Sequence, residues 1–247
     1  MIGARRAVVV LGAVAGLSGC SKGSDVSHSA GAAAPAAAPS SPSSAGLQPP
    51  PMKQYSDPAP GRIGQLAPGT GLPVGSKVPD VHARDLDGND VALSALYNKG
   101  PILLAFYRGG WCPYCSTENH SLSVAYPEFQ KRGVTPVTIS VDKPEAEAKT
   151  KAVYAIPFPV LSDSDAVVLE AFHVVNNVDD ATFAKMRGFG LDLESYSGKP
   201  HHKIAIPSLF LIDRTGTVRW AHSDPDFMVR PSIAQILAAI DAAHIGS

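Results

Sequence analysis

The sequence contains few cysteines, no excess of charge of either sign and no long apolar run. Its 247 residues include three cysteines, Cys20, Cys112 and Cys115, too few for a four-cysteine zinc site. The 21 Lys and Arg residues balance 22 Asp and Glu residues, which argues against nucleic acid as a partner and against a polybasic membrane patch. The hydrophobic content of 45% is sufficient for the core of one folded domain.

The first twenty residues form three zones typical of a bacterial secretory signal. Arg5-Arg6 gives a basic start, and the apolar run 7–17 is too short to cross a bilayer. Leu17-Ser18-Gly19-Cys20 resembles the lipobox of bacterial lipoproteins, in which the cysteine is lipidated and becomes the mature N-terminus; the alternative is a cleaved signal with an incidental cysteine. Ser21 stands where an aspartate would indicate inner-membrane retention. We therefore expect a signal peptide at 1–19 and a periplasm-facing lipid anchor at Cys20, with the outer membrane favoured.

The next segment, residues 20–70, is dominated by Ala, Pro, Ser and Gly. It has hardly any large apolar side chain to offset the entropy cost of ordering the chain. The composition predicts a disordered linker between the lipid anchor and a single domain at 71–247.

From residue 71 onward, apolar runs alternate with helical patterns, which predicts an α/β domain with a mixed central sheet flanked by helices. Asp87-Gly88 predicts the turn of an N-terminal hairpin, and the apolar run 101–107 predicts a strand buried on both faces. Further strands are expected at 134–141, 158–161, 204–213 and 217–222, and helices at 112–126, 144–154, 163–172 and 233–240. Residues 174–203 are irregular and predict either a surface insertion or a functional lid.

The motif Cys112-Pro113-Tyr114-Cys115 follows the buried strand and opens a helix. Unpaired backbone amides and the helix dipole favour a thiolate on Cys112, and the helical spacing allows the two sulfurs to form a disulfide. A stapling disulfide in so small a loop stabilises the fold by only ~2 kcal/mol. A zinc site completed by His201 and His202 lacks a second cysteine pair. The strand before the motif and the helix after it favour a redox pair.

The stretch Phe106 to Cys115 (FYRGGWCPYC), together with Leu209-Phe210-Leu211-Ile212-Asp213, resembles the AhpC/TSA family of peroxiredoxin-like proteins in the thioredoxin superfamily. The resemblance covers about 72–245 and implies a thioredoxin-like, peroxiredoxin-like fold. It places Cys115 at the peroxidatic position and Cys112 where peroxiredoxins keep a threonine. The proline of the family pattern falls on Arg108, and its downstream arginine falls on Pro207.

Three residues near the pair carry further predictions. Ile206-Pro207-Ser208 resembles the cis-proline segment that faces the cysteine pair in thioredoxins, so we predict a cis Ile206–Pro207 bond opposite Cys112. Arg108 either supplies a cation near a thiolate or is simply solvated. Trp111 either covers the sulfur and shapes access to it or fills the core.

These observations predict an oxidoreductase with no bound cofactor or metal. The leading hypothesis is a thiol-dependent peroxidase that reduces a hydroperoxide and is reset by an external thiol reductant. The alternative is a protein disulfide reductase or oxidase of the envelope, with Cys112 as nucleophile and Cys115 as the resolving thiol. A third possibility is a copper-handling module, although copper chaperones have wider cysteine spacing and a defined histidine ligand. Helix position favours Cys112 as the first sulfur to react, whereas the family resemblance assigns peroxide to Cys115.

Overall fold

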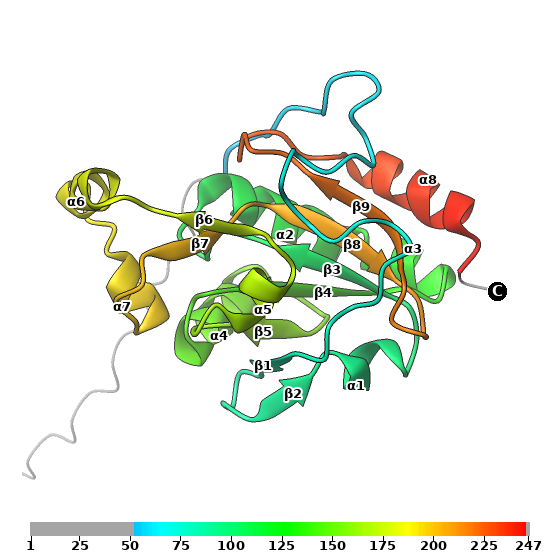
Figure 1. Ribbon diagram of the computed structural model, residues 1–247, viewed down its shortest axis with the longest axis horizontal. Helices are drawn as coiled ribbons and strands as arrows, with labels where there is room; N and C mark the ends of the chain where they lie inside the picture. The colour runs from blue at the N-terminus through cyan, green and yellow to red at the C-terminus, as the bar shows by residue number, and fades with distance from the viewer. Residues whose placement is uncertain (1–51, 246–247) are drawn as a thin grey trace, which may run out of the picture. The chain divides into compact units, whose positions relative to one another are not determined.

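The computed structural model describes residues 52–245, and a seven-stranded sheet forms the centre of that region (Figure 1). The strand order is β2-β1-β5-β4-β3-β8-β9, and β6 and β7 form a separate ladder. The strands are β1 (His82–Arg84), β2 (Asp90–Ala92), β3 (Ile102–Phe106), β4 (Thr135–Ser140), β5 (Val160–Ser162), β6 (Val175–Asn177), β7 (Lys203–Ala205), β8 (Ser208–Ile212) and β9 (Val218–Ser223). The helices are α1 (Ser94–Tyr97), α2 (Pro113–Val124), α3 (Tyr126–Lys131), α4 (Pro144–Val153), α5 (Val167–Ala171), α6 (Asp180–Gly188), α7 (Leu193–Ser197) and α8 (Ile233–Ala243).

The strand predicted at 101–107 is the centre of the sheet. All five residues of β3 are buried, β4 pairs with it in parallel and β8 pairs with it antiparallel. A strand covered on both faces needs apolar side chains on both, which explains the unbroken apolar run. Because β3 and β4 are parallel, the residues that follow them, Tyr107 and Asp142, emerge at the same edge of the sheet. That edge carries the cysteine pair.

The predicted N-terminal hairpin is confirmed. β1 and β2 pair antiparallel, with Ala83 opposite Val91. The Asp85 side chain accepts hydrogen bonds from the backbone amides of Asp87 and Asn89, at 2.9 and 2.8 Å, and Gly88 adopts a φ of +82°. An aspartate that bonds forward and a glycine with positive φ are the residues that this turn requires.

Apolar side chains fill both faces of the sheet. Ile102, Leu104 and Phe106 point into one cluster, whereas their neighbours Leu103 and Ala105 point into the other, as alternation along a strand demands.

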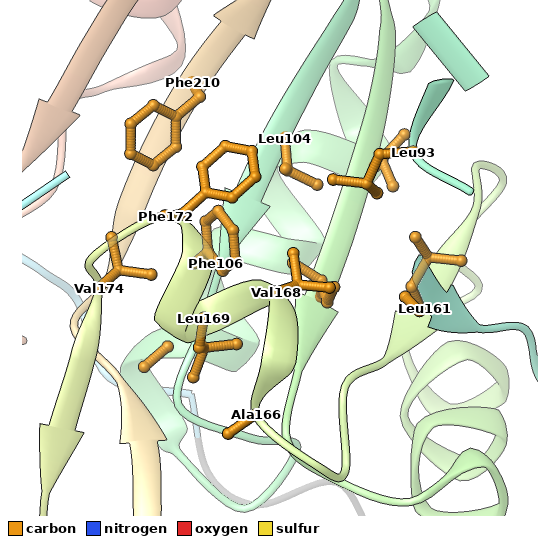
Figure 2. Close-up of a cluster of buried hydrophobic side chains, with 14 of the residues drawn as sticks. Leu93, Leu104, Phe106, Leu161, Ala166, Val168, Leu169, Phe172, Val174 and Phe210 are labelled. Carbon is orange, nitrogen blue, oxygen red and sulfur yellow. The ribbon is translucent and has the colours of Figure 1, made fainter. Parts of the chain in front are cut away.

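Three aromatic rings anchor the first of these clusters. The ring of Phe106 lies 5.0 Å from that of Phe172 and 5.7 Å from that of Phe210, centroid to centroid (Figure 2). These separations lie in the range of favourable aromatic contacts. The end of β3 that leads into the cysteine motif is therefore packed in the core.

The C-terminal helix α8 is held at its start by a capping box between Ser232 and Gln235. It packs Ile236 and Ile240 against the second face of the sheet, so the helix predicted from apolar spacing at 233–240 is confirmed.

The irregular stretch 174–203 is a folded insertion. β6 and β7 pair antiparallel, with Asn176 opposite Ile204, and α6 and α7 extend from this ladder on the side away from α8 (Figure 1). Asp179 caps α6 and Asp192 caps α7 by accepting backbone hydrogen bonds. These local caps explain how a segment with weak apolar periodicity forms two short helices.

Residues 52–70 contact the domain, although the composition predicts a linker up to residue 70. Ser56 forms a parallel bridge with Val229, and the amide of Ala67 donates to the Ser223 hydroxyl at 2.8 Å. Parts of the segment 52–70 therefore bond directly to the domain. We call residues 52–57 the strap.

The predicted signal at 1–19, the lipidation site Cys20 and the linker up to residue 51 lie outside the described residues. Between residues 52 and 245, none of the helices combines the length and the apolar character needed to cross a membrane.

Candidate active site

Two glycines let the chain turn tightly from β3 into the cysteine helix. Gly109 has a φ of +147°, and a Cβ atom there would lie 2.3 Å from the indole nitrogen of Trp111. A Cβ atom on Gly110 would lie 2.0 Å from the hydroxyl of Thr150 in α4. Both positions therefore exclude side chains, and the loop packs directly against its neighbours.

Cys112 is the N-cap of α2, as the sequence predicts. Its backbone is extended, Pro113 follows as the first helical residue, and its carbonyl accepts the amide of Ser116 at 2.9 Å. A hydrogen bond from the Cys115 side chain lowers the pKa of the Cys112 thiol to about 6, with help from the charges of Arg108 and Arg230 and in spite of burial. Cys112 is therefore a thiolate at neutral pH.

Cys115 has the opposite character. Burial raises the pKa of its thiol well above the ordinary value, and the hydrogen bond to Cys112 and the charge on Cys112 add to that increase. Both cysteines are reduced, with exposed fractions of 1% for Cys112 and 0% for Cys115. The site thus pairs Cys112, whose pKa is lowered, with Cys115, whose pKa is raised, and both sulfurs are buried.

Arg108 lies between aromatic rings at the edge of the site. Its guanidinium is 4.1 Å from the ring centroid of Phe227 and 5.1 Å from that of Trp111, which are favourable cation–π separations. Its charge also helps to lower the pKa of Cys112. Arg108 therefore contacts the Phe227 and Trp111 rings, and its role toward the thiolate stays a prediction.

Trp111 is half-buried and packs against the cluster formed by Tyr107 and the two cysteines. The ring of Tyr196 lies 6.5 Å from it, centroid to centroid. Since Tyr196 belongs to α7, the insertion contributes to the wall of the site next to the tryptophan.

Sequence reasoning missed a buried ion pair beside Cys115. The Arg230 guanidinium donates through Nε to the Glu118 carboxylate at 3.1 Å, and its Nη2 lies 3.9 Å from the Cys115 sulfur. Both charged residues are buried. The Arg230 charge lowers the pKa of Cys115 against the dominant effect of burial, so it stabilises a thiolate at that sulfur. The sequence does not mark Arg230, which stands in a loop outside any motif.

Two buried carboxyl groups lie behind the glycine loop. Asp142 accepts the Gly110 amide at 2.8 Å, and burial raises the pKa of Asp142 to about 7. Glu147 accepts hydrogen bonds from the hydroxyls of Tyr107 and Ser140, and burial raises the pKa of Glu147 well above its ordinary value. The structure thus buries the Asp142 carboxyl group against the backbone of Gly110.

The structure contradicts the predicted cis-proline. Residues 52–245 contain no cis peptide bond, so Ile206–Pro207 is trans. The Ile206 amide donates to the Val174 carbonyl at 2.7 Å, and the Ser208 hydroxyl donates to the Ile206 carbonyl at 2.8 Å. These bonds hold the short β7–β8 connection, and a trans X–Pro bond is preferred by about 0.5–1 kcal/mol. A three-residue resemblance therefore did not fix the isomer.

The two histidines considered for a zinc site have other partners. The His201 ring bonds the Ser164 carbonyl at 2.9 Å, and the His202 ring bonds the Glu194 carboxylate at 2.8 Å. Over the described part of the chain, no three His, Cys, Asp or Glu side chains are grouped to hold a metal ion.

The chain is similar to known redox proteins. The AhpC/TSA family model matches residues 74–221. Thiol-disulfide oxidoreductase ResA of Geobacillus thermodenitrificans is 33% identical over 106 residues, which are 42% of this chain and 60% of that protein. A putative peroxiredoxin of Mycobacterium tuberculosis is 35% identical over 103 residues, 42% of this chain and 65% of that protein. The chain thus spans less than two thirds of either relative.

Solved structures resemble this chain over a larger part of its length than the two relatives do. Peroxidoxin BcpB from Mycobacterium tuberculosis matches with a TM-score of 0.55 at 23% identity, over 69% of this chain and 97% of that one. A PrxQ mutant from Xylella fastidiosa matches with a TM-score of 0.55 at 20% identity, over 70% and 98%. At these identities the likeness shows the fold alone, and it confirms the predicted thioredoxin-like fold.

Proposed function

The chain belongs to the AhpC/TSA family, and we propose that it reduces hydroperoxides with Cys112 and Cys115, which cycle between a dithiol and a disulfide. The observation that carries this proposal is the burial of both sulfurs, with exposed fractions of 1% and 0%. A hydroperoxide is small enough to reach a recessed sulfur, whereas the disulfide of a folded protein needs an exposed one.

The charges around the pair support Cys112 as the attacking sulfur. Its thiolate attacks the terminal peroxide oxygen, the O–O bond breaks, and the alkoxide leaves and takes up a proton to become an alcohol. Cys112 is then a sulfenic acid. This order departs from the family resemblance, which assigns peroxide to Cys115, because burial keeps Cys115 protonated in the resting site.

Cys115 then closes the cycle. It loses its proton and attacks the Cys112 sulfur, the S–O bond breaks, and the hydroxyl leaves as water with a proton. The charge of Arg230 lowers the pKa of Cys115 and so favours this deprotonation. Two electrons have passed from the cysteine pair to the peroxide, and an external thiol reductant returns the disulfide to the dithiol.

Thiol–disulfide exchange with a protein is the second candidate. The order of an acidic Cys112 followed by a less acidic Cys115 suits a nucleophile with a resolving thiol. The similarity to a thiol-disulfide oxidoreductase also favours it. In this reaction Cys112, which is buried, has to become accessible to a protein disulfide.

We further propose that the reaction takes place in the cell envelope, with the protein held at the membrane by a lipid on Cys20. The support is the basic, apolar and small-residue order of the first twenty residues.

Two activities of the reduced protein test the proposal. Wild type should consume hydrogen peroxide or cumene hydroperoxide faster than it reduces the disulfides of insulin. Cys115→Ser should accumulate a dimedone-reactive sulfenic acid on Cys112, and Cys112→Ser should consume little peroxide. Insulin reduction without peroxide consumption would overturn the proposal in favour of disulfide exchange. Turnover that survives in both single variants would exclude the paired mechanism altogether.

A further inference from the structure

The strap bonds to two segments that are far apart in sequence, the helix α2 and the loop that carries Arg230. At one end, the Ser56 amide donates to the Met228 carbonyl at 2.8 Å, and the Ser56 carbonyl accepts the Arg230 amide at 2.9 Å. At the other end, the Thr117 hydroxyl donates to the Lys53 carbonyl at 2.7 Å. The strap therefore connects the loop that carries Arg230 to the cysteine helix α2.

Each of these attachment points adjoins one half of the buried ion pair. Thr117 precedes Glu118 in α2, and Ser56 bonds the backbone of Arg230 itself. Tyr55 belongs to the strap and is half-buried; burial raises the pKa of its phenol, which also interacts with the charges of Glu118 and Arg230. The strap thus contacts both elements at the place where the guanidinium faces the Cys115 sulfur, at 3.9 Å.

We propose that the strap is a positioning element of the thiol site, which holds the Arg230 guanidinium against Cys115 by bridging α2 and the Arg230 loop. The proposal takes the redox role of the two cysteines from the proposed function and adds a segment that the composition places in a linker.

The buried pair of Glu118 and Arg230 explains why such a bridge is needed. Glu118 and Arg230 are exposed by only 4% and 3%, and a buried charge pair is favourable only when its geometry is well kept. The attraction between the guanidinium and a thiolate falls as their separation grows, and it does so most steeply where water is excluded. A small shift of the Arg230 loop therefore changes the stability of the Cys115 thiolate.

Two pairs of variants of the full chain test the two ends of the bridge. In each pair one variant breaks a bond and the other keeps it. Ser56→Pro removes the amide that bonds Met228, whereas Ser56→Ala keeps both backbone bonds. Thr117→Val removes the hydroxyl that bonds Lys53, whereas Thr117→Ser keeps it. The second pair keeps the test available if Ser56→Pro fails to fold.

The readout is the rate of Cys115 alkylation at a fixed alkaline pH, with each cysteine followed separately by mass spectrometry. Each unit by which the Cys115 pKa rises lowers its thiolate fraction roughly tenfold. Ser56→Pro and Thr117→Val should therefore be alkylated at Cys115 several-fold more slowly than Ser56→Ala and Thr117→Ser. In an Arg230→Gln background the slowing should disappear, because the strap acts through that charge.

Equal or faster alkylation of Cys115 in the bridge-breaking variants would overturn the inference, since the strap would then be a spacer or merely a cover. Slowing that persists in Arg230→Gln would also overturn it. Absence of peroxide consumption by wild type, together with the expected alkylation pattern, would reject the proposed substrate and leave the positioning role intact.

Discussion

At the scale of single residues, the site combines side chains that a motif identifies with side chains that only the fold brings in. Cys112, Cys115, Arg108 and Trp111 are close in sequence, so their proximity follows from the motif. Arg230 pairs with Glu118 across 112 residues of sequence. No local pattern distinguishes such an arginine from a surface residue, which is why the sequence did not predict the cation beside Cys115.

The glycine loop gives a prediction at this scale. Gly110→Ala should lower the free energy of unfolding by ~1–3 kcal/mol because the new methyl group has no room; its Cβ would lie 2.0 Å from the Thr150 hydroxyl. Gly188→Ala is the control, because a Cβ atom there has nothing within 4 Å. The control should leave stability unchanged or raise it by up to about 1 kcal/mol, because Gly188 ends helix α6.

Urea-induced unfolding of the two variants measures the difference. Thr150→Ala in the Gly110→Ala background removes the clashing hydroxyl and should restore part of the lost stability. Equal stability of Gly110→Ala and Gly188→Ala would show that the loop has more space than its packing implies.

At the scale of elements, the sequence predicted those parts whose stability comes from apolar burial. The run 101–107 and the spacing in 233–240 carry the periodicity of buried strands and amphipathic helices, and both elements formed. The Asp87-Gly88 turn was predictable because its residues bond within the turn itself.

The elements that were missed depend on other forces. The strap is held mainly by backbone hydrogen bonds to Met228 and Arg230. Amino-acid composition does not predict such bonds, because any residue except proline can form them. The insertion 174–203 forms its helices around the caps Asp179 and Asp192, which are too local to distinguish a lid from a surface excursion. The isomer at Ile206–Pro207 depends on tertiary context, so a short resemblance was insufficient.

At the scale of the whole molecule, the sequence predicts a signal, a lipid site and a domain in that order. Cys20→Ser should release a soluble form or leave the signal uncleaved, because the acylated cysteine is the proposed attachment to the membrane. Fractionation of cells followed by intact-mass analysis checks this outcome. Ser21→Ala serves as the control and should stay with the membranes. Recovery of wild type without lipid in a soluble extract would contradict the anchor.

The central claim is that Cys112 is the reactive thiolate of the pair, and the pH dependence of its alkylation tests that claim most directly. The rate of Cys112 labelling by iodoacetamide should fall as the pH drops through about 6, where the thiolate becomes protonated. Cys115 should stay largely unlabelled over the same range, because burial raises its pKa well above the ordinary value. A midpoint for Cys112 at roughly 8.5, the ordinary value for a free thiol, or earlier labelling of Cys115, would contradict the account.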